Sequence, residues 1–330
     1  MIDHRVKFFD PGKAYIKHRA ELLKEYDRVR TAGDLILRRD VDLFEENLAE
    51  FVGTKYAVAL NSGTDALVLS LKAITSNTEI AVQSYTFKST VGAVITSGNV
   101  PILYDLDVKP SKEKIGIVAH IAGEIFPMPE TSIVIEDAAQ ALGAIKNPTS
   151  LVQTWSFYPA KILGAPGDAG AITTNDEGLA LYVKEARNHF KTNNEEFGIN
   201  SRMDNVWAAE LNILFKYLPE RIERRKEIAE RYNKELKKLE EIGKIKLPNK
   251  QPGRVYQDFI LMESERDRLY EFLKEKGLET IKNEYPFPPQ YPKLPLAKSY
   301  EANTLRLPCN PELEDEEVDY VIQKIQEFYA

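Results

Sequence analysis

Residues 56–74, YAVALNSGTDALVLSLKAI, decide the fold class of this 330-residue chain. The run begins with apolar, β-favouring residues, continues through the turn NSGTD, and ends with the apolar spacing of a buried helix. The same kind of apolar run recurs in IAVQ (80–83), VPILYDLD (100–107), KIGIVAHIAG (114–123) and SIVIEDAAQALGA (132–144). Unbroken runs are typical of strands that helices cover on both faces. They predict an α/β fold with a mainly parallel sheet.

The remainder of the chain is more helical. Residues 18–51 predict one or two amphipathic helices, broken near Gly33, and a long charged helical stretch runs from about 204 to 241. The break LPNKQPGR (247–254) is followed by a strand (255–262), a helix (266–277), the short run TLRLP (304–308) and a last helix from about 312 to 328. We therefore predict a large α/β domain over 1–244 and a small α+β domain over 245–330.

Composition excludes several classes of protein. The 44 Lys and Arg and 51 Asp and Glu give a formal charge of −7, which argues against a nucleic-acid binding protein. The single cysteine, Cys309, allows no internal disulfide, and no paired cysteines indicate a metal site. No apolar run has the length of a signal peptide or of a membrane span. We expect a cytoplasmic protein without a metal and without a membrane partner.

NSGTDAL (61–67) is a candidate phosphate site. A strand that runs through Ser-Gly-Thr directly into a helix presents unpaired backbone N–H groups and the positive helix end, and Gly63 allows close approach. An ordinary helix N-cap explains the same residues equally well.

An acid follows at the end of the strand in SIVIEDAAQALGA. Glu136 and Asp137 lie at the carboxyl edge, where open α/β sheets bind ligands. An acid there suits a cation such as the protonated ring nitrogen of pyridoxal phosphate (PLP), and Gln140 could reach the same ring. The alternative is that Asp137 caps a helix over AAQAL.

Lys161 is a candidate nucleophile. It follows Ser156 in TWSFYPAKILG and lies between apolar neighbours, which disfavour the ammonium form and lower the pKa. Such an amine forms a Schiff base with an aldehyde and then moves protons between carbons. A surface lysine is the alternative.

The three features together, in this order, form the layout of PLP enzymes of the aspartate aminotransferase fold type. The chain resembles the DegT/DnrJ/EryC1/StrS family of sugar aminotransferases from about residue 20 to its end. The motifs that carry the resemblance are SGTDAL (62–67), YTF (85–87), EDAAQALGA (136–144), SFYPAK (156–161), GDAGAI (167–172), RNH (187–189) and GINSRMD (198–204). The resemblance implies the PLP-dependent transferase fold type I, with a mainly parallel seven-stranded sheet in the large domain.

The resemblance also implies roles for individual residues. Lys161 would hold the cofactor and carry protons, Asp137 would pair with the ring nitrogen, and Gln140 would contact the phenolic oxygen. Phe87 would stack on the face of the cofactor ring. The phosphate would be held by Gly63, Thr64, Asp65, Ser156 and, from the neighbouring subunit, Asn200. A homodimer is therefore implied, with L-glutamate as amino donor and a keto-sugar, usually nucleotide-linked, as acceptor.

Several positions depart from the family pattern, and they bear mainly on the substrate. The segments after DLD (105–107) and between LGA (142–144) and TWSF (154–157) are short, and Ala169 replaces a glycine. The loop EYPFPPQYP (284–292) stands where many relatives carry histidines. Tyr285 is a candidate to border the sugar, and His189 is a candidate substrate residue or a capped surface histidine.

Three other functions compete with this one. A PLP-dependent sugar dehydratase of the same fold has histidine in place of the lysine, so Lys161 argues against it. A catalytically silent PLP- or sugar-binding regulatory homologue stays open because of the short loops. A dinucleotide-binding oxidoreductase would need a GxGxxG motif that YAVALNSGTDAL does not supply.

Overall fold

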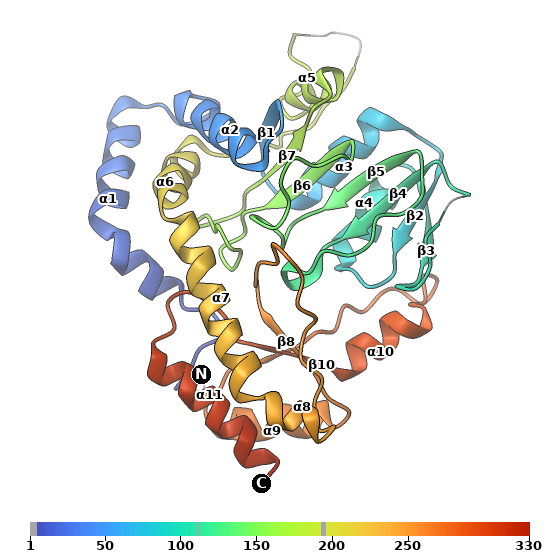
Figure 1. The fold of residues 1–330 in the computed structure, drawn as a ribbon. Coiled ribbons are helices and arrows are strands. Elements are labelled where there is room, and N and C mark those ends of the chain that lie inside the picture. The colour runs from blue at the N-terminus through green and yellow to red at the C-terminus, as the bar shows by residue number, and fades with distance from the viewer. Residues whose placement is uncertain (1–4, 111, 193–195) are drawn as a thin grey trace.

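The computed structural model describes residues 5–110, 112–192 and 196–330, which form a larger α/β unit and a smaller unit packed beside it (Figure 1). The larger sheet consists of β1 (Tyr56–Leu60), β2 (Glu79–Gln83), β3 (Val100–Tyr104), β4 (Ile115–Ala119), β5 (Ile133–Asp137), β6 (Val152–Ser156) and β7 (Gly170–Thr174). Their spatial order is β1-β7-β6-β5-β4-β2-β3. Strands β3, β2, β4, β5 and β6 are parallel neighbours, and β7 is antiparallel to β1 and β6. The predicted mainly parallel sheet is confirmed.

Helices cover both faces of this sheet. On one face, α2 (Arg39–Val52) and α6 (Asn205–Lys216) pack on side chains such as Trp155. On the other face lie α3 (Gly63–Ile74), α4 (Lys88–Thr96) and α5 (Glu177–Ala186), packed on side chains such as Ile172. Because all residues of β4 are buried, this strand needs apolar side chains at successive positions. This is the physical reason for the unbroken apolar runs in the sequence.

The chain opens with α1 (Pro11–Ala32), which begins earlier than the predicted residue 18. Asp10 caps it by accepting hydrogen bonds from the backbone N–H groups of Gly12 and Lys13, and Pro11 occupies the first helical position. Gly33 ends the helix with φ of 73°, so the predicted break near Gly33 separates α1 from α2.

The smaller unit is built on a three-stranded sheet of order β8-β10-β9. Its elements, with the helices that lead into it, are α7 (Leu218–Glu235), α8 (Lys237–Glu241), β8 (Phe259–Met262), α9 (Arg266–Glu275), β9 (Ile281–Lys282), α10 (Pro295–Asn303), β10 (Thr304–Leu307) and α11 (Asp315–Phe328). Its core also takes in Val6 and Tyr232, which precede residue 245 in the chain. The domain boundary at 244 and 245 stays a prediction. No helix in the described ranges is long and apolar enough to cross a membrane.

The carboxyl ends of parallel strands meet at one edge of the larger sheet. Asp137 ends β5, Ser156 ends the neighbouring β6, and Gly63 begins α3 three residues after β1. The residues 138–144 after Asp137 form turns, so the alternative reading of a helix over AAQAL is wrong. This edge therefore brings the three predicted features of the site to one place.

Candidate active site

The N-terminus of α3 forms the predicted anion cradle. The hydroxyl of Ser62 accepts a hydrogen bond from the backbone N–H of Asp65 at 3.0 Å and caps the helix. The first N–H groups of a helix lack partners within it and lie at its positive end, so they attract an anion. A Cβ built on Gly63 would lie 3.0 Å from the Cβ of Ser156, so this serine lies directly against the turn. Gly63, Thr64 and Ser156 are thus brought together.

Asp65 has a second role that the sequence did not indicate. Its carboxylate accepts a hydrogen bond from the hydroxyl of Ser201 at 2.7 Å, and the Asn61 backbone N–H donates to the same hydroxyl at 3.3 Å. These bonds hold the segment that contains Asn200 against the cradle. Asn200 itself is exposed in the single subunit, as an interface residue must be. Its contact with a neighbouring subunit's phosphate stays a prediction.

Gly170 closes the cradle from β7, and a side chain there is expected to damage it. A Cβ at this position would lie 2.2 Å from the carbonyl carbon of Ser62, and backbone cannot move away cheaply. Gly170→Ala should therefore destabilise the fold by about 1–3 kcal/mol, as overpacking does, and weaken PLP binding. Urea unfolding and a PLP titration measure both effects.

Gly92→Ala is the matched control for this prediction. Gly92 lies inside α4, and a Cβ there would meet nothing within 4 Å. This substitution should stabilise the folded protein by up to about 1 kcal/mol, because alanine is the better helix former. Equal effects of the two variants would contradict the proposed role of Gly170.

Asp137 is buried and held in a fixed orientation. One carboxylate oxygen accepts a hydrogen bond from the Thr90 hydroxyl at 2.7 Å, and the other accepts one from the Ala139 backbone N–H at 3.3 Å. The Thr86 and Thr90 hydroxyls lie 2.7 Å apart, so this chain of bonds continues from α4 to the segment just before it. A carboxylate fixed in this way at the sheet edge can serve as the counter-charge of a cationic ring nitrogen.

Gln140 and two aromatic residues lie around the next part of the site. The amide oxygen of Gln140 accepts a hydrogen bond from the Ala122 backbone N–H at 2.7 Å, and its side chain lies close to that of Tyr285. The rings of Tyr285 and Phe87 meet edge to face, with centroids 5.5 Å apart. Phe87 is 53% exposed, so it keeps a ring face that a ligand can cover. The structure thus joins Tyr285 to the other candidates.

Lys161 lies in the turn after β6. Its backbone N–H donates to the Tyr158 carbonyl at 2.8 Å, and the Gln257 amide donates to the Ala160 carbonyl at 2.5 Å. Although Lys161 as a residue keeps some accessible surface, burial of its amino group lowers the pKa to about 8. The nearby Arg306 lowers this pKa further, and Asp137 and Asp258 oppose the decrease. The expected apolar surroundings are present at Ile162 and Leu163, both buried, but Tyr158 is largely exposed.

The lowered pKa predicts how cofactor uptake depends on pH. Below pH 8 most of the Lys161 amine is protonated and cannot attack an aldehyde, so the uptake rate should increase about tenfold per pH unit. Above pH 8 the free amine predominates and the rate should level off. Stopped-flow absorbance of cofactor-free protein mixed with PLP measures this profile. A rate that still increases steeply above pH 9 would indicate a lysine with an ordinary pKa.

The sequence did not indicate the ion pair of Arg306 with Asp258. The Arg306 Nε donates to the Asp258 carboxylate at 2.9 Å, and one terminal nitrogen lies 3.5 Å from the Tyr285 hydroxyl. Burial raises the pKa of Tyr285, so this phenol stays protonated. Arg306 belongs to β10, and Asp258 immediately precedes β8; only the pairing of these strands brings them together.

His189 is the candidate that the described residues do not link to the site. It is exposed, follows α5 and has φ of 68°. Within the described ranges its side chain has no hydrogen bond or ion pair with Lys161, Asp137 or the other candidates.

A model of the DegT/DnrJ/EryC1/StrS aminotransferase family matches residues 17–326. The chain belongs to this family. It is thus an aminotransferase, and the enzyme class expected from the sequence is confirmed.

Curated relatives match this aminotransferase over nearly its full length. The dTDP-3-amino-3,6-dideoxy-α-D-galactopyranose transaminase of Aneurinibacillus thermoaerophilus is 32% identical, over 98% of this chain and 99% of that protein. A protein of Geobacillus stearothermophilus named pleiotropic regulatory protein is 31% identical, over 98% of each chain. The first alignment extends over 365 positions, more than the 330 residues of this chain, so the relative carries segments that are absent here.

Two solved structures are similar to this chain over nearly its full length. The crystal structure of S. venezuelae DesV in complex with a ketimine intermediate has a TM-score of 0.90 at 30% identity, over 98% of each chain. The structure of NtdA from Bacillus subtilis with bound cofactor PMP also gives 0.90, at 26% identity, and covers 99% of this chain and 85% of that one. The predicted PLP-dependent transferase fold type I is confirmed.

Proposed function

We propose that this aminotransferase transfers the amino group of L-glutamate to a nucleotide-linked keto-sugar, with Lys161 holding PLP as a Schiff base. The observation that carries the proposal is the position of the Lys161 amine. It is buried at the carboxyl edge of the sheet, has a pKa of about 8, and is close enough to Asp137 for the carboxylate to act on it. A nucleophilic amine beside a fixed acid is what the chemistry requires.

The residues at the edge of the sheet fit PLP. Gly63 and Gly170 let β6 and β7 pack directly against the turn before α3, where a Cβ would collide with neighbouring atoms, and the positive end of α3 beside this turn suits a phosphate. Asp137 offers a fixed negative charge for the ring nitrogen, and Phe87 offers an exposed ring face. When bound, PLP supplies an electron-withdrawing ring that stabilises negative charge on the substrate carbon.

Each residue then has a separate task. The Lys161 amine holds the cofactor between turnovers and, when released, moves a proton between carbons as base and acid. Asp137 keeps the ring nitrogen protonated, and Gln140 approaches the phenolic oxygen. Over both half-reactions an amino group and a carbonyl oxygen exchange places between glutamate and the keto-sugar, so no oxidant or reductant is needed.

The sugar as acceptor is supported by the relatives. Their names describe transaminases of dTDP-linked sugars and, in Acidithiobacillus ferrooxidans, a UDP-N-acetyl-3-dehydro-α-D-glucosamine 3-aminotransferase. One relative from Bacillus subtilis is named 3-oxo-glucose-6-phosphate:glutamate aminotransferase, which also supports glutamate as donor. The regulatory alternative is supported by the name of the Geobacillus relative and by that of a Saccharopolyspora erythraea relative, erythromycin biosynthesis sensory transduction protein EryC1.

Turnover with a panel of acceptors tests this function. The protein with PLP and L-glutamate is incubated with nucleotide-linked 3-keto and 4-keto sugars and with a free keto-sugar, and mass spectrometry detects the amino sugar. We expect product and an equal amount of 2-oxoglutarate with a nucleotide-linked acceptor. PLP binding without any product from the panel would favour the regulatory alternative.

We further propose a cytoplasmic homodimer whose active sites are shared. The segment before Asn200 exposes Phe197 completely, and an exposed large apolar side chain suits an interface. Asn200→Asp should place a negative charge against the partner subunit's bound phosphate and inactivate both sites of a dimer.

Mixed dimers test the sharing. In a C2 dimer of one Asn200→Asp and one Lys161→Ala chain, one site carries both changes and the other none, so a 1:1 mixture should regain about a quarter of wild-type activity. If the sites are formed within single chains, the mixture should show no more activity than the average of the two variants.

A further inference from the structure

We propose that His120, which lies behind the site, is a positioning residue that makes Gln140 present its amide N–H donors to the cofactor. This inference rests on the proposed function for the identity of the cofactor, but the connection from His120 to Gln140 rests on hydrogen bonds of the chain itself. His120 follows β4, and both it and its partner Glu136 are buried.

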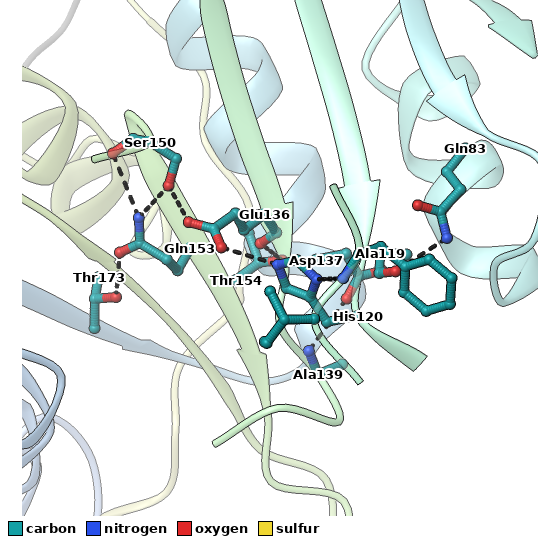
Figure 2. Close-up of polar contacts among 12 residues, drawn as sticks. Gln83, Ala119, His120, Glu136, Asp137, Ala139, Ser150, Gln153, Thr154 and Thr173 are labelled. Atoms are coloured by element: carbon teal, nitrogen blue, oxygen red, sulfur yellow. Dashed lines mark hydrogen bonds and ion pairs between the residues drawn. The ribbon is translucent and has the colours of Figure 1, made fainter. Parts of the chain in front are cut away.

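The contacts of the imidazole fix its tautomer. The Phe126 backbone N–H donates to Nδ1 at 3.2 Å, so Nδ1 is an acceptor without a proton. The proton of the neutral ring is therefore on Nε2, which lies 2.9 Å from a carboxylate oxygen of Glu136 and donates to it (Figure 2). The other oxygen of Glu136 accepts a hydrogen bond from the Ser150 hydroxyl. His120 is thus held as a neutral ring with one acceptor and one donor, both used.

His120 holds the short loop that follows β4, residues 121–126, by hydrogen bonds at both of its ends. The His120 backbone N–H donates to the Asp137 carbonyl at 3.0 Å, and the ring accepts from Phe126 at the far end of the loop. Between these two points runs the turn Ile121–Gly123, in which Ala122 has φ of 55°. A left-handed alanine costs on the order of 1–2 kcal/mol, so the neighbouring contacts must hold it in place.

This loop orients the amide of Gln140. The Ala122 N–H donates to the Gln140 Oε1 at 2.7 Å, which identifies that atom as the oxygen because a backbone N–H cannot face an amide NH₂ at this distance. The NH₂ group is left to face the site, where the Tyr285 side chain lies close to that of Gln140. An N–H donor stabilises a phenolic oxygen that carries negative charge, and an amide oxygen in that place would repel it.

Two substitutions of His120 separate the ring's two contacts. The Oδ1 of asparagine occupies the place of Nδ1 and can accept from Phe126, so His120→Asn should keep the loop. Glutamine reaches the place of Nε2 and can donate to Glu136, but it offers no acceptor to Phe126. His120→Gln should therefore loosen the loop, although both variants stay polar and buried.

The first readout is the pH midpoint at which the visible band of the PLP-loaded protein changes. Loss of a donor to the phenolic oxygen destabilises its deprotonated form, so His120→Gln should raise the midpoint by about 0.5–1 pH unit, and His120→Asn should leave it unchanged. In a Gln140→Ala background, His120→Gln should add nothing, because it acts through the same residue. A shift that persists in that background would overturn the proposal.

Thr173→Val serves as a control for purely structural damage. Thr173 belongs to the same buried network, since its hydroxyl donates to the Gln153 amide oxygen at 2.9 Å (Figure 2). It also accepts from the Trp155 indole N–H at 2.9 Å, but it lies on β7 and not on the loop. This variant should lose stability to urea without moving the midpoint. If His120→Gln behaves in the same way, the role of His120 is structural only and the proposal is wrong.

A second readout needs no cofactor. Amide hydrogen exchange of residues 121–126 in the cofactor-free protein should be at least tenfold faster in His120→Gln than in His120→Asn or the wild type. Equal exchange in all three would overturn the inference, even if PLP binds as proposed. Conversely, faster exchange in a protein that does not bind PLP would refute the proposed function and leave the connection from His120 to the loop intact.

Discussion

Lys161→Ala is expected to reduce the rate at which L-glutamate converts the bound cofactor by more than about a thousandfold, since one residue supplies both the nucleophile and the proton carrier. The cradle at α3 does not involve this side chain, so PLP should still bind, but without the covalent link. Single-turnover absorbance with L-glutamate measures the rate, and denaturation after borohydride treatment shows whether the cofactor is attached to the chain.

Lys184→Ala is the matched control for this variant. Lys184 is an exposed lysine in the last turn of α5, on a helix that covers the sheet. Its removal should leave both readouts at wild-type values. Retention of borohydride-stable cofactor in Lys161→Ala would mean that a different lysine carries it.

Asp137→Asn should have the second-largest effect, a loss of about 10²–10³-fold in the same half-reaction, as is typical when one preorganised electrostatic contact is removed. Asparagine has the same shape, its Oδ1 can still accept from the Ala139 N–H and its NH₂ can donate to the Thr90 hydroxyl, so packing is preserved and only the charge is lost. The ring nitrogen of PLP would then lose its proton, and the neutral ring would be less electron-withdrawing. Single-turnover rates with glutamate measure the loss.

Thr90→Val separates orientation from charge at this position. It removes the 2.7 Å hydrogen bond to Asp137 but leaves the carboxylate, so it should cost much less than Asp137→Asn. An Asp137→Asn protein as fast as the wild type would show that the ring nitrogen needs no counter-charge from this residue.

The sequence was sufficient for the elements whose pattern is local. The apolar runs of β1 and β5 and the turn before α3 follow from burial on both faces and from helix capping, which are properties of neighbouring residues. It was insufficient for strand direction. Strand β7 is antiparallel to β1 and β6, and nothing in GAITT distinguishes it from a parallel strand.

The same distinction holds within the site. Lys161, Asp137 and Gly63 could be named because each lies in a motif whose order along the chain indicates the chemistry. Thr90, Ser201 and Arg306 could not, because each reaches the site from an element far away in the sequence. Hydroxyl and guanidinium groups are common on protein surfaces, so nothing in the sequence marks these three side chains. Only the packing of the fold brings each of them to a partner in the site.

If this chain performs the first half of a transamination with Lys161, L-glutamate must change the colour of the PLP-loaded protein. The visible absorption spectrum of the purified protein with PLP is recorded before and after L-glutamate is added. We expect a yellow band that glutamate bleaches and that a keto-acid restores. A band that glutamate leaves unchanged would rule out glutamate as donor, and the absence of any PLP binding would rule out the proposed PLP-dependent function of this chain.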